Sequence, residues 1–268
     1  MKVDGKIIAV TGAGSGIGRE LTLLLLSMGA KIAGIDLNAG ALAETAKLAA
    51  KNPADFEPIV ANIADRDAVE RLPEQLVARF GMIDGVINNA GIIQPFVRVT
   101  ALDYSTVERV LNVNLLGTLH VVKAFLPHLL KRPEGHIVNL SSMGGFVPVP
   151  GQTIYCAAKA GVRLLSEGLA SELIDTNVRV TVVFPGAIAT NIAANSGARA
   201  PSSVHQSSSK IKPLQAHIAA ELIVKAMERN ARHVCVGRDS AFMSLLTRLN
   251  PGFAARMIAN QMKGLLPD

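Results

Sequence analysis

The sequence contains no tryptophan, two tyrosines and two cysteines, and aromatic residues make up only 4% of its 268 positions. Two cysteines, Cys156 and Cys235, are too few for a disulfide framework, so we expect a reducing compartment, the cytoplasm. Basic residues interleaved with aromatic ones, which are typical of a nucleic-acid surface, do not occur, so no nucleic-acid partner is expected. The six histidines form no pair on one helical face, and no metal site is expected.

Long apolar runs and an excess of charge along most of the chain are also missing. No uninterrupted apolar stretch approaches the roughly 18 residues of a membrane-spanning helix, and the polar start at Met1–Lys6 predicts no signal peptide. The net charge is +6, and the ten basic and four acidic residues of 199–268 account for all of it. Because 49% of residues are hydrophobic and no linker divides the chain, we expect one domain over 1–268.

Glycine, in contrast, is concentrated near the N-terminus. The apolar run Lys6–Val10 leads into Gly12-Ala-Gly-Ser-Gly-Ile-Gly18 and then into an apolar helical pattern. A strand, a glycine loop and a helix in this order form a phosphate cradle, because the helix N-terminus offers free N–H groups. Asp36 ends the next predicted strand, where a carboxylate accepts hydrogen bonds from an adenosine ribose. These segments predict dinucleotide binding.

Apolar runs alternate with helical patterns about seven times, which predicts a parallel sheet with right-handed crossovers. The strands are expected at 6–10, 31–36, 56–63, 82–87, 136–142, 178–184 and 233–236. The helices are expected at 20–28, 42–50, 66–80 with an interruption near Pro73, 103–130 as one or two helices, 152–173 and 216–229. The fold class is therefore α/β, a single-domain, Rossmann-like, doubly wound parallel sheet with helices on both faces.

Tyr155 and Lys159 are four positions apart and share one face of a predicted helix. An ammonium group near a phenol favours the phenolate, so we expect Lys159 to lower the pKa of Tyr155 and to make it a proton donor and acceptor near neutral pH. Ser142 ends the preceding predicted strand, at the edge where open α/β sheets bind ligands. A solvated helical Tyr–Lys pair is the alternative, and it is weakened because separate motifs indicate one site.

Together these motifs resemble the classical short-chain dehydrogenase/reductase family over roughly residues 5–240. The matching segments follow the family's order and spacing: Thr11–Gly18, Asn88–Gly91, Asn114, Ser142, Tyr155 with Lys159, and Pro185–Gly186 with Thr190. The resemblance implies that hydride passes between a nicotinamide ring and a carbonyl carbon, with the protein supplying orientation and one proton.

The resemblance also implies a role for each catalytic position. Tyr155 is the acid/base toward the substrate oxygen, and Ser142 hydrogen-bonds the same oxygen. Lys159 holds the nicotinamide ribose and lowers the pKa of the tyrosine. Asn114 helps to hold a water in a proton relay.

A cofactor site follows from the same resemblance. Its residues are Gly12, Ser15, Ile17 and Gly18 at the pyrophosphate, Asp36 at the adenosine ribose, Asn62 and Ile63 at the adenine, Asn89, Ala90 and Gly91 beneath the ribose, Tyr155 and Lys159 at the nicotinamide ribose, and Pro185, Gly186, Ile188 and Thr190 on the nicotinamide side. Asn62 replaces the aspartate usual in the family, but an amide oxygen can still accept from the adenine amine.

The cofactor is expected to be NAD(H) rather than NADP(H). The Asp36 carboxylate would repel a 2′-phosphate, and neither Ser15 nor Leu37, where relatives that accept the phosphate carry a basic residue, is basic. Arg19 is interpreted as a surface charge at the start of the helix.

The loops expected beside the substrate, Ile92–Phe96 and Met143–Pro150, are apolar and suit a lipophilic secondary alcohol or ketone, although ordinary loop packing explains them equally well. A steroid, a long-chain hydroxyacyl group and an aliphatic alcohol all fit. One alternative is an acyl-carrier-protein-linked 3-oxoacyl reductase, a branch that usually takes NADPH. A catalytically silent nucleotide-sensing protein is the other, and the intact Ser142, Tyr155 and Lys159 argue against it.

Two further segments lie outside the motifs. Residues 191–215, rich in small polar residues, are predicted to be a substrate lid, with a plain surface loop as the alternative. Residues 240–268 are predicted to be a helical extension, and its basic amphipathic part, 242–263, fits a peripheral membrane contact, a cover for the substrate cleft or a subunit contact. Because relatives pair the helices at 103–130 and 152–173, a homodimer or homotetramer is expected.

Overall fold

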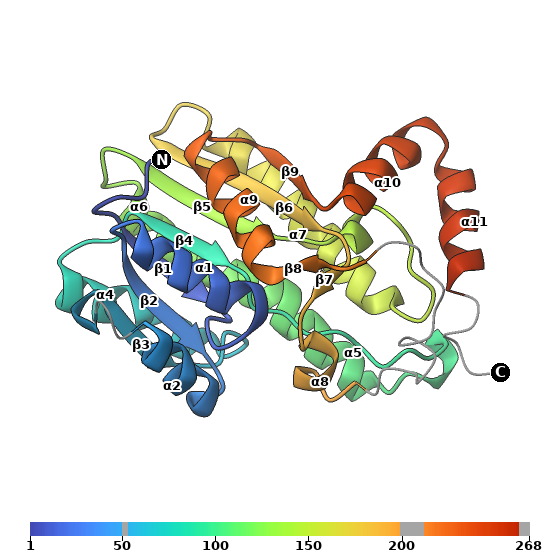
Figure 1. The fold of residues 1–268 in the computed structure, drawn as a ribbon, viewed down its shortest axis with the longest axis horizontal. Coiled ribbons are helices and arrows are strands. Elements are labelled where there is room, and N and C mark those ends of the chain that lie inside the picture. The colour runs from blue at the N-terminus through green and yellow to red at the C-terminus, as the bar shows by residue number, and fades with distance from the viewer. Residues whose placement is uncertain (50–52, 199–211, 263–268) are drawn as a thin grey trace.

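A seven-stranded parallel sheet runs through the middle of the computed structural model, with helices on both faces (Figure 1). The structure describes residues 1–49, 53–198 and 212–262. The strand order is β3-β2-β1-β4-β5-β6-β9, which confirms the predicted doubly wound α/β fold. Residues 199–211 of the predicted lid, 263–268 of the predicted extension and Ala50 lie outside the described part of the chain.

The elements follow the predicted alternation closely. The strands are β1 (Ile7–Thr11), β2 (Lys31–Asp36), β3 (Phe56–Val60), β4 (Gly85–Asn88), β5 (Gly135–Leu140), β6 (Val178–Pro185), β7 (Ile188–Ala189), β8 (Leu214–Gln215) and β9 (His233–Val236). The helices are α1 (Gly16–Ser27), α2 (Ala39–Leu48), α3 (Arg66–Glu70), α4 (Leu72–Phe80), α5 (Tyr104–Leu111), α6 (Gly117–Leu129), α7 (Thr153–Glu172), α8 (Ile192–Asn195), α9 (Ala216–Glu228), α10 (Arg238–Leu249) and α11 (Pro251–Gln261). Short helical turns are η1 (Pro53–Asp55), η2 (Val99–Ala101), the π-helical η3 (Asn112–Leu116) and η4 (Met143–Gly145).

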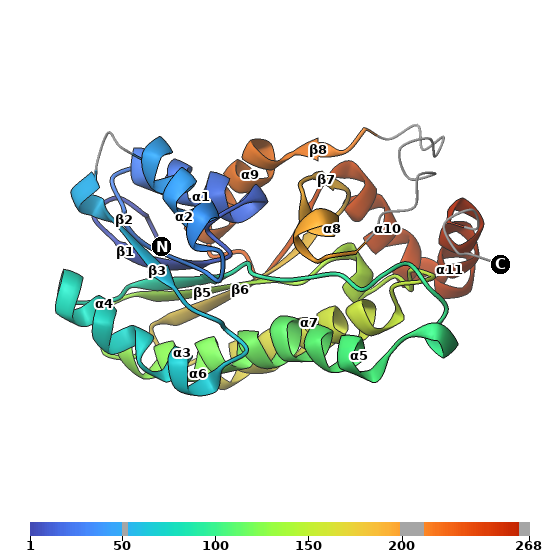
Figure 2. The same cartoon turned by 90° about the horizontal axis from the view of Figure 1, so that it is seen from below.

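The core consists of two apolar layers, one on each face of the sheet. Helices α1, α2 and α9 cover one face, and α3, α6 and α7 cover the other (Figure 2). Every residue of β1, β4 and β5 is buried, because helices lie on both sides of these central strands. Strands buried on both faces favour apolar side chains, and these three are largely apolar, with buried polar exceptions such as His136 and Asn139 of β5.

The strand order reverses between β1 and β4. From β1 the chain proceeds outward through β2 and β3, and then returns to place β4 on the other side of β1. Such a reversal opens a crevice at the carboxyl ends of the strands. Thr11, Asn88, Leu140 and Pro185 end their strands at this edge, so the predicted site residues that follow them are gathered there.

Several predicted boundaries were wrong: β4 begins at Gly85 rather than at 82, and α2 begins at Ala39 rather than at 42. Three others differ for a local reason. β3 ends at Val60 rather than at 63, because Asn62 Oδ1 accepts a hydrogen bond from the Ala64 N–H (3.0 Å) and turns the chain. β5 ends at Leu140, since Ser142 already begins the turn η4, where its Oγ accepts from the Gly144 N–H (3.0 Å). α1 begins at Gly16 rather than at 20, so the glycine loop runs directly into the helix.

The predicted helical stretch 103–130 is a continuous run of α5, the π-helical turn η3 and α6. Among the described residues it is the one helix, Tyr104–Leu129, that is long and apolar enough to cross a membrane by length and hydropathy. Val121, Phe125 and Leu129 within it are fully buried against the sheet. Those apolar residues therefore serve the core of this fold.

The C-terminal helices α10 and α11 form a hairpin at one end of the molecule (Figure 1), split at Pro251 as predicted. One side packs on the loop after β5, where Met243, Ala254 and Ile258 bury Val147. The other side exposes a set of large apolar residues, Phe242, Leu245, Leu249 and Phe253. One side of this hairpin therefore packs within the chain, and whether residues 242–263 contact a membrane, cover the cleft or contact a subunit stays a prediction.

Candidate active site

The glycine loop between β1 and α1 has the shape of a phosphate cradle. Gly12 has φ +70°, and a Cβ atom there would lie 2.7 Å from Asn89 Nδ2. A Cβ atom on Gly18 would overlap the Gly12 carbonyl group. Ser15 precedes α1 without capping its first turn by a side-chain hydrogen bond, so N–H groups at the positive end of the helix dipole are left for an anion. The loop therefore fits a pyrophosphate.

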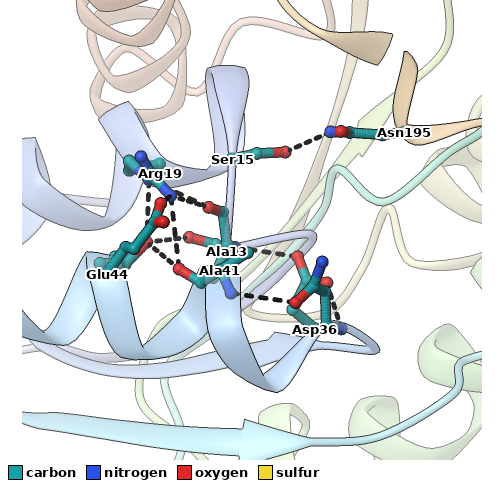
Figure 3. Close-up of polar contacts among 10 residues, drawn as sticks. Ala13, Ser15, Arg19, Asp36, Ala41, Glu44 and Asn195 are labelled. Carbon is teal, nitrogen blue, oxygen red and sulfur yellow. Dashed lines mark hydrogen bonds and ion pairs between the residues drawn. The ribbon is translucent and has the colours of Figure 1, made fainter. Parts of the chain in front are cut away.

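Asp36 lies at the carboxyl end of β2, with its carboxylate held against the glycine loop (Figure 3). One oxygen, Oδ2, accepts from the Gly14 N–H (2.9 Å), and the other, Oδ1, accepts from the Asn38 N–H (2.9 Å). These two bonds fix the direction of the carboxylate and leave further lone pairs for hydroxyl donors. The Asp36 carboxylate, the predicted ribose contact, is thus oriented beside the glycine loop.

Arg19 is not the surface charge that the sequence suggested. Its guanidinium donates to the Gly14 carbonyl (3.0 Å from Nε), to Thr45 Oγ1 (3.1 Å) and to Glu44 Oε2 (2.8 Å), and only 23% of its side chain is exposed (Figure 3). It therefore joins the glycine loop to α2. Nε and Nη2 of Arg19 are therefore engaged within the protein, which ties most of this guanidinium to the glycine loop and α2.

Thr11 fastens the second cofactor segment to the first. Its buried Oγ1 accepts from the Asn89 N–H (3.0 Å) and the Ala90 N–H (3.1 Å), while Asn89 Nδ2 donates to the Thr11 carbonyl (2.9 Å). The sequence placed Thr11 in a motif but gave it no role. Its position at the end of a strand, directly before the glycines, was the available signal.

Asn114 occupies the middle of the π-helical turn η3, a local form that is frequent at functional sites. Its Nδ2 donates to the carbonyl groups of Ile92 and Val110 (both 2.9 Å), and its Oδ1 accepts from the Ile92 N–H (3.2 Å). A Cβ atom on Gly91 would lie 2.7 Å from Asn114 Oδ1 and 3.3 Å from Lys159 Nζ. Asn114, Gly91 and Lys159 are therefore neighbours, and the Asn114 amide holds the loop after β4 to the end of α5.

Ser142, Tyr155 and Lys159 meet where η4 faces the first turns of α7. A Cβ atom on Gly144 would lie within 3.5 Å of both Tyr155 Cε1 and Ser142 Oγ, and Lys159 Nζ lies 6.0 Å from the centre of the Tyr155 ring. Lys159 is buried, and its ammonium donates to the Leu140 carbonyl (2.9 Å). Three of the four predicted catalytic residues are thus brought together.

The expected direction of the Tyr155 pKa was wrong for this structure. Burial raises the pKa of Tyr155 to about 12, and the hydrogen bond with Ser142 offsets only part of that rise. Burial also lowers the pKa of Lys159 to about 8. The sequence argument counted the attraction between phenolate and ammonium, whereas the loss of hydration of both groups is larger here.

The nicotinamide-side segment is held by residues from the end of the chain. The Gly186 N–H donates to the Val236 carbonyl (2.9 Å), and the Ala187 N–H donates to Asp239 Oδ2 (2.7 Å). Ile188 pairs with Leu214 in the small sheet of β7 and β8. Asp239 was not predicted from the sequence, because its contact joins segments 52 positions apart.

The segment after β7 reaches back to the glycine loop. A Cβ atom on Gly16 would lie 3.1 Å from Thr190 Cγ2, and Asn195 Nδ2 donates to Ser15 Oγ (2.9 Å; Figure 3). Thr190 and Asn195, the latter in the described part of the predicted lid, therefore lie beside the loop that would hold the pyrophosphate.

The two predicted adenine contacts lie apart from the catalytic group, after β3. Asn62 is exposed, and its Oδ1 is engaged by the Ala64 N–H. Ile63 is buried and packs under Gly117 at the start of α6. In the part of the chain that the structure describes, no group of three or more His, Cys, Asp or Glu residues is arranged to hold a metal ion.

Comparison with known proteins identifies the family. The family described as short chain dehydrogenase matches residues 6–201. This chain belongs to that family. As a short-chain dehydrogenase it is an oxidoreductase with a nicotinamide-dinucleotide site, in agreement with the glycine loop and the oriented Asp36 carboxylate.

Relatives of this short-chain dehydrogenase differ in what their names state. The chain is 35% identical over 271 residues to the putative oxidoreductase SadH of Mycobacterium tuberculosis, covering 98% of each protein. It is 40% identical over 192 residues to the 3-oxoacyl-acyl-carrier-protein reductase FabG of Thermotoga maritima, covering 71% of this chain and 77% of that protein.

Solved structures that resemble this short-chain dehydrogenase carry either dinucleotide. A short-chain dehydrogenase/reductase from Burkholderia phymatum in complex with NAD is 25% identical, covers 94% of this chain and 96% of its own, and superposes with a TM-score of 0.86. A short-chain dehydrogenase from Burkholderia cenocepacia in complex with NADP is also 25% identical, covers 96% and 99%, and gives a TM-score of 0.80.

Burial of the Lys159 ammonium leads to a prediction about stability. Below pH 8 the lysine is charged in the folded and the unfolded state, and the folded state bears the cost of desolvation. Between about 8 and 10.5 the folded protein loses this proton first, so the unfolded state binds more protons and stability rises with pH. We therefore expect Lys159→Met, without added dinucleotide, to raise the free energy of unfolding at pH 7 by roughly 2 kcal/mol, the lost hydrogen bond to Leu140 offsetting part of the gain.

Denaturant unfolding at several pH values tests this expectation. The advantage of Lys159→Met over the wild type should be largest below pH 8 and should vanish near pH 10.5. An advantage that stays constant across this range would show that the variant acts through packing rather than through the buried charge.

Proposed function

We propose that this short-chain dehydrogenase transfers a hydride between NAD(H) and a lipophilic secondary alcohol or ketone, with Tyr155 as the acid/base. The observation that carries the proposal is the meeting of Ser142, Tyr155 and Lys159 next to Gly91, at the same sheet edge as the glycine loop. A proton donor, a hydrogen-bond donor and a cation thus share one site beside a dinucleotide cradle.

The pKa values of Tyr155 and Lys159 indicate which of these groups carries a proton at neutral pH. Because the pKa of Tyr155 is raised to about 12, its phenol stays protonated at neutral pH and can give a proton to a carbonyl oxygen during reduction. Ser142 donates a hydrogen bond to the same oxygen, and the Lys159 ammonium, charged below about pH 8, stabilises the negative charge left on Tyr155. When bound, the dinucleotide supplies or takes up the hydride.

Asp36 supports the choice of NAD(H). Its carboxylate is fixed beside the glycine loop, and the next residue, Leu37, is 68% exposed and uncharged. Arg19, the nearby cation, is engaged by Gly14 and Glu44. A 2′-phosphate would meet this carboxylate with no basic residue at Ser15 or Leu37, which also disfavours an NADPH-dependent acyl-carrier-protein-linked reductase.

The surroundings of the catalytic loop support a lipophilic substrate. Met143 and Phe146, just after Ser142, pack in one apolar cluster with Met257 of α11. Met257 also lines a hollow of about 620 Å³ on α11, together with Phe253, Arg256, Asn260 and Gln261. The apolar loop Met143–Pro150 is therefore partly covered by the C-terminal hairpin, and Met257 contributes both to this cluster and to the hollow.

Turnover of a panel of secondary alcohols and ketones with NAD(H) and NADP(H) tests the proposal. Turnover of lipophilic alcohols with NAD is the expected result, and Tyr155→Phe is the inactive control. Faster reduction of 3-oxoacyl thioesters with NADPH would favour the acyl-carrier-protein-linked reductase instead. Dinucleotide binding without turnover of any member would favour a nucleotide-sensing protein.

We also propose a homo-oligomer, because helices α5–α7 and the turn after α7 leave large apolar side chains uncovered. Tyr104, Leu116, Leu164 and Ile174 are between 39% and 85% exposed. Light scattering at micromolar concentration should give the mass of a dimer or tetramer, and Leu164→Glu should lower it by placing a charge in the contact. Leu48→Glu, on α2, is the matched control with a similarly exposed leucine. A monomeric wild type would refute this proposal.

A further inference from the structure

Gln94 is the polar exception in the apolar loop that follows β4. It lies between Ile93 and Pro95, and none of its surface is exposed. Burying a primary amide is costly unless its donors and acceptors are bonded. Its hydrogen bonds therefore reveal what this residue does.

The side chain of Gln94 is bonded entirely to the start of α7. Its Oε1 accepts from the Ile154 N–H (2.9 Å) and from the Tyr155 N–H (3.1 Å), and its Nε2 donates to the Gly151 carbonyl (3.0 Å). Gln152 completes the link, because its Nε2 donates to the backbone carbonyl of Gln94 (2.7 Å). One buried amide thus holds the helix end on which Tyr155 lies.

These bonds replace an ordinary helix cap. The first N–H groups of a helix lack partners within it and are usually satisfied by the side chain of the preceding residue. At α7 the preceding residue is Gln152, and it makes no such bond. Gln94 supplies the acceptor from about 60 positions earlier in the chain.

The other end of the same loop is held by Asn114. Its amide bonds both the N–H and the carbonyl group of Ile92, two residues before Gln94. The short stretch from Gly91 to Gln94 therefore connects the segment predicted to lie under the cofactor ribose with the helix that carries Tyr155. A shift of this stretch moves one relative to the other.

We propose that Gln94 is a positioning residue that fixes Tyr155 relative to the cofactor segment Asn89–Gly91 by capping α7 from the neighbouring loop. The proposal rests on the proposed function in that Tyr155 is taken as the acid/base. Misplacing such a group by about 1 Å is enough to slow a reaction by about 100-fold.

The first test is kinetic. Gln94→Met keeps an unbranched side chain of similar length but removes the acceptor and the donor, so we expect kcat to fall by roughly 10- to 100-fold while the dinucleotide dissociation constant is unchanged. Gln94→Glu keeps the acceptor for the two N–H groups and should retain most of the wild-type kcat. If Gln94→Met does not fold, Gln94→Asn, one methylene too short to reach α7, takes its place.

Ser166→Ala is the matched control on the same helix. Ser166 is buried and bonds Val162 and Asn139 (2.6 and 2.9 Å), three turns away from Tyr155. Its loss should lower the melting temperature without lowering kcat. If Gln94→Met loses no more kcat than Ser166→Ala, Gln94 only stabilises the fold and the proposal is overturned.

The second test needs no turnover. The chain has no tryptophan and only two tyrosines, and Tyr104 is 85% exposed, so in a Tyr104→Phe background tyrosinate absorbance reports Tyr155 alone. With Gln94 intact, the pKa near 12 predicts little ionisation up to about pH 10.5. With Gln94→Met, the loosened helix end admits water and the midpoint should fall toward the ordinary value near 10.

The two tests separate the proposals. An unchanged titration in Gln94→Met overturns the positioning role even if kcat falls. A shifted titration in a protein that turns over no substrate with either dinucleotide would support the positioning of Tyr155 and would refute the proposed function alone.

Discussion

Tyr155→Phe should lower kcat by about 1,000-fold or more, while dinucleotide binding is retained. The phenol is the proton donor of the proposed reaction, and general acid–base catalysis contributes roughly 100- to 10,000-fold. The ring still packs beside Gly144 and Lys159, so the site keeps its shape. Initial rates with a secondary alcohol and a dinucleotide titration measure the two effects separately.

Tyr104→Phe is the natural control, because it removes the other tyrosine hydroxyl of the chain from an exposed position on α5. It should leave kcat unchanged. Retention of more than a small fraction of wild-type kcat by Tyr155→Phe would mean that another group moves the proton.

The second large effect concerns cofactor choice. For the wild type we expect kcat/KM with NAD to exceed that with NADP by at least roughly tenfold, which corresponds to about 1.4 kcal/mol. Combining Asp36→Ala with Leu37→Arg should reverse this preference, because the repulsion disappears and an exposed position next to it gains a phosphate partner. Steady-state kinetics with both dinucleotides give the ratio directly.

Single variants separate the two causes of the cofactor preference, the Asp36 charge and the missing basic residue at Leu37. Leu37→Arg alone keeps the carboxylate and should improve use of NADP only modestly. Asp36→Asn keeps an oxygen that can accept from the Gly14 N–H, so it removes the charge while preserving that contact to the loop. Equal use of both dinucleotides by the wild type, or no change in the double variant, would show that Asp36 does not contact the ribose.

The fold was predictable because its signals are local. A buried parallel strand needs a continuous apolar run, a crossover helix needs an apolar stripe, and both are visible in a short window of sequence. Errors occurred where one side chain redirects the backbone, as Asn62 does after β3 and Ser142 does after β5. Such turns depend on a single hydrogen bond, which a pattern of apolar residues does not contain.

The central residues of the site were predictable for a different reason. Gly12 and Gly18 are required because the backbone approaches closely there, and Tyr155 and Lys159 are separated by one helical turn. The local geometry of each motif can therefore be predicted from its residue types and spacing. Strand ends then collect the motifs at one edge of the sheet. The structure brought Ser142, Tyr155, Lys159, Asn114 and Gly91 together as this reasoning required.

The supporting residues were not predictable in the same way. Gln94, Arg19 and Asp239 act through hydrogen bonds to residues between 5 and 61 positions away. No local sequence pattern indicates which residue each of them bonds. The direction of the Tyr155 pKa shift was predicted wrongly for a related reason. The shift is caused mainly by burial, which depends on the whole fold and not on the neighbouring lysine alone. A polar residue isolated in an apolar loop, such as Gln94, nevertheless indicates that its side chain has a hydrogen-bonding role.

The contact between Asp239 and Ala187 also bears on how this enzyme is made. Protein synthesis proceeds from the N-terminus, so the glycine loop, Ser142 and Tyr155 leave the ribosome well before Asp239 does. Until that residue arrives, the N–H of Ala187 lacks the carboxylate that holds it. The edge strand β9, which pairs with β6, is itself completed only just before Asp239. A chain that stops before Asp239 therefore carries Ser142 and Tyr155 while its nicotinamide-side segment lacks this contact.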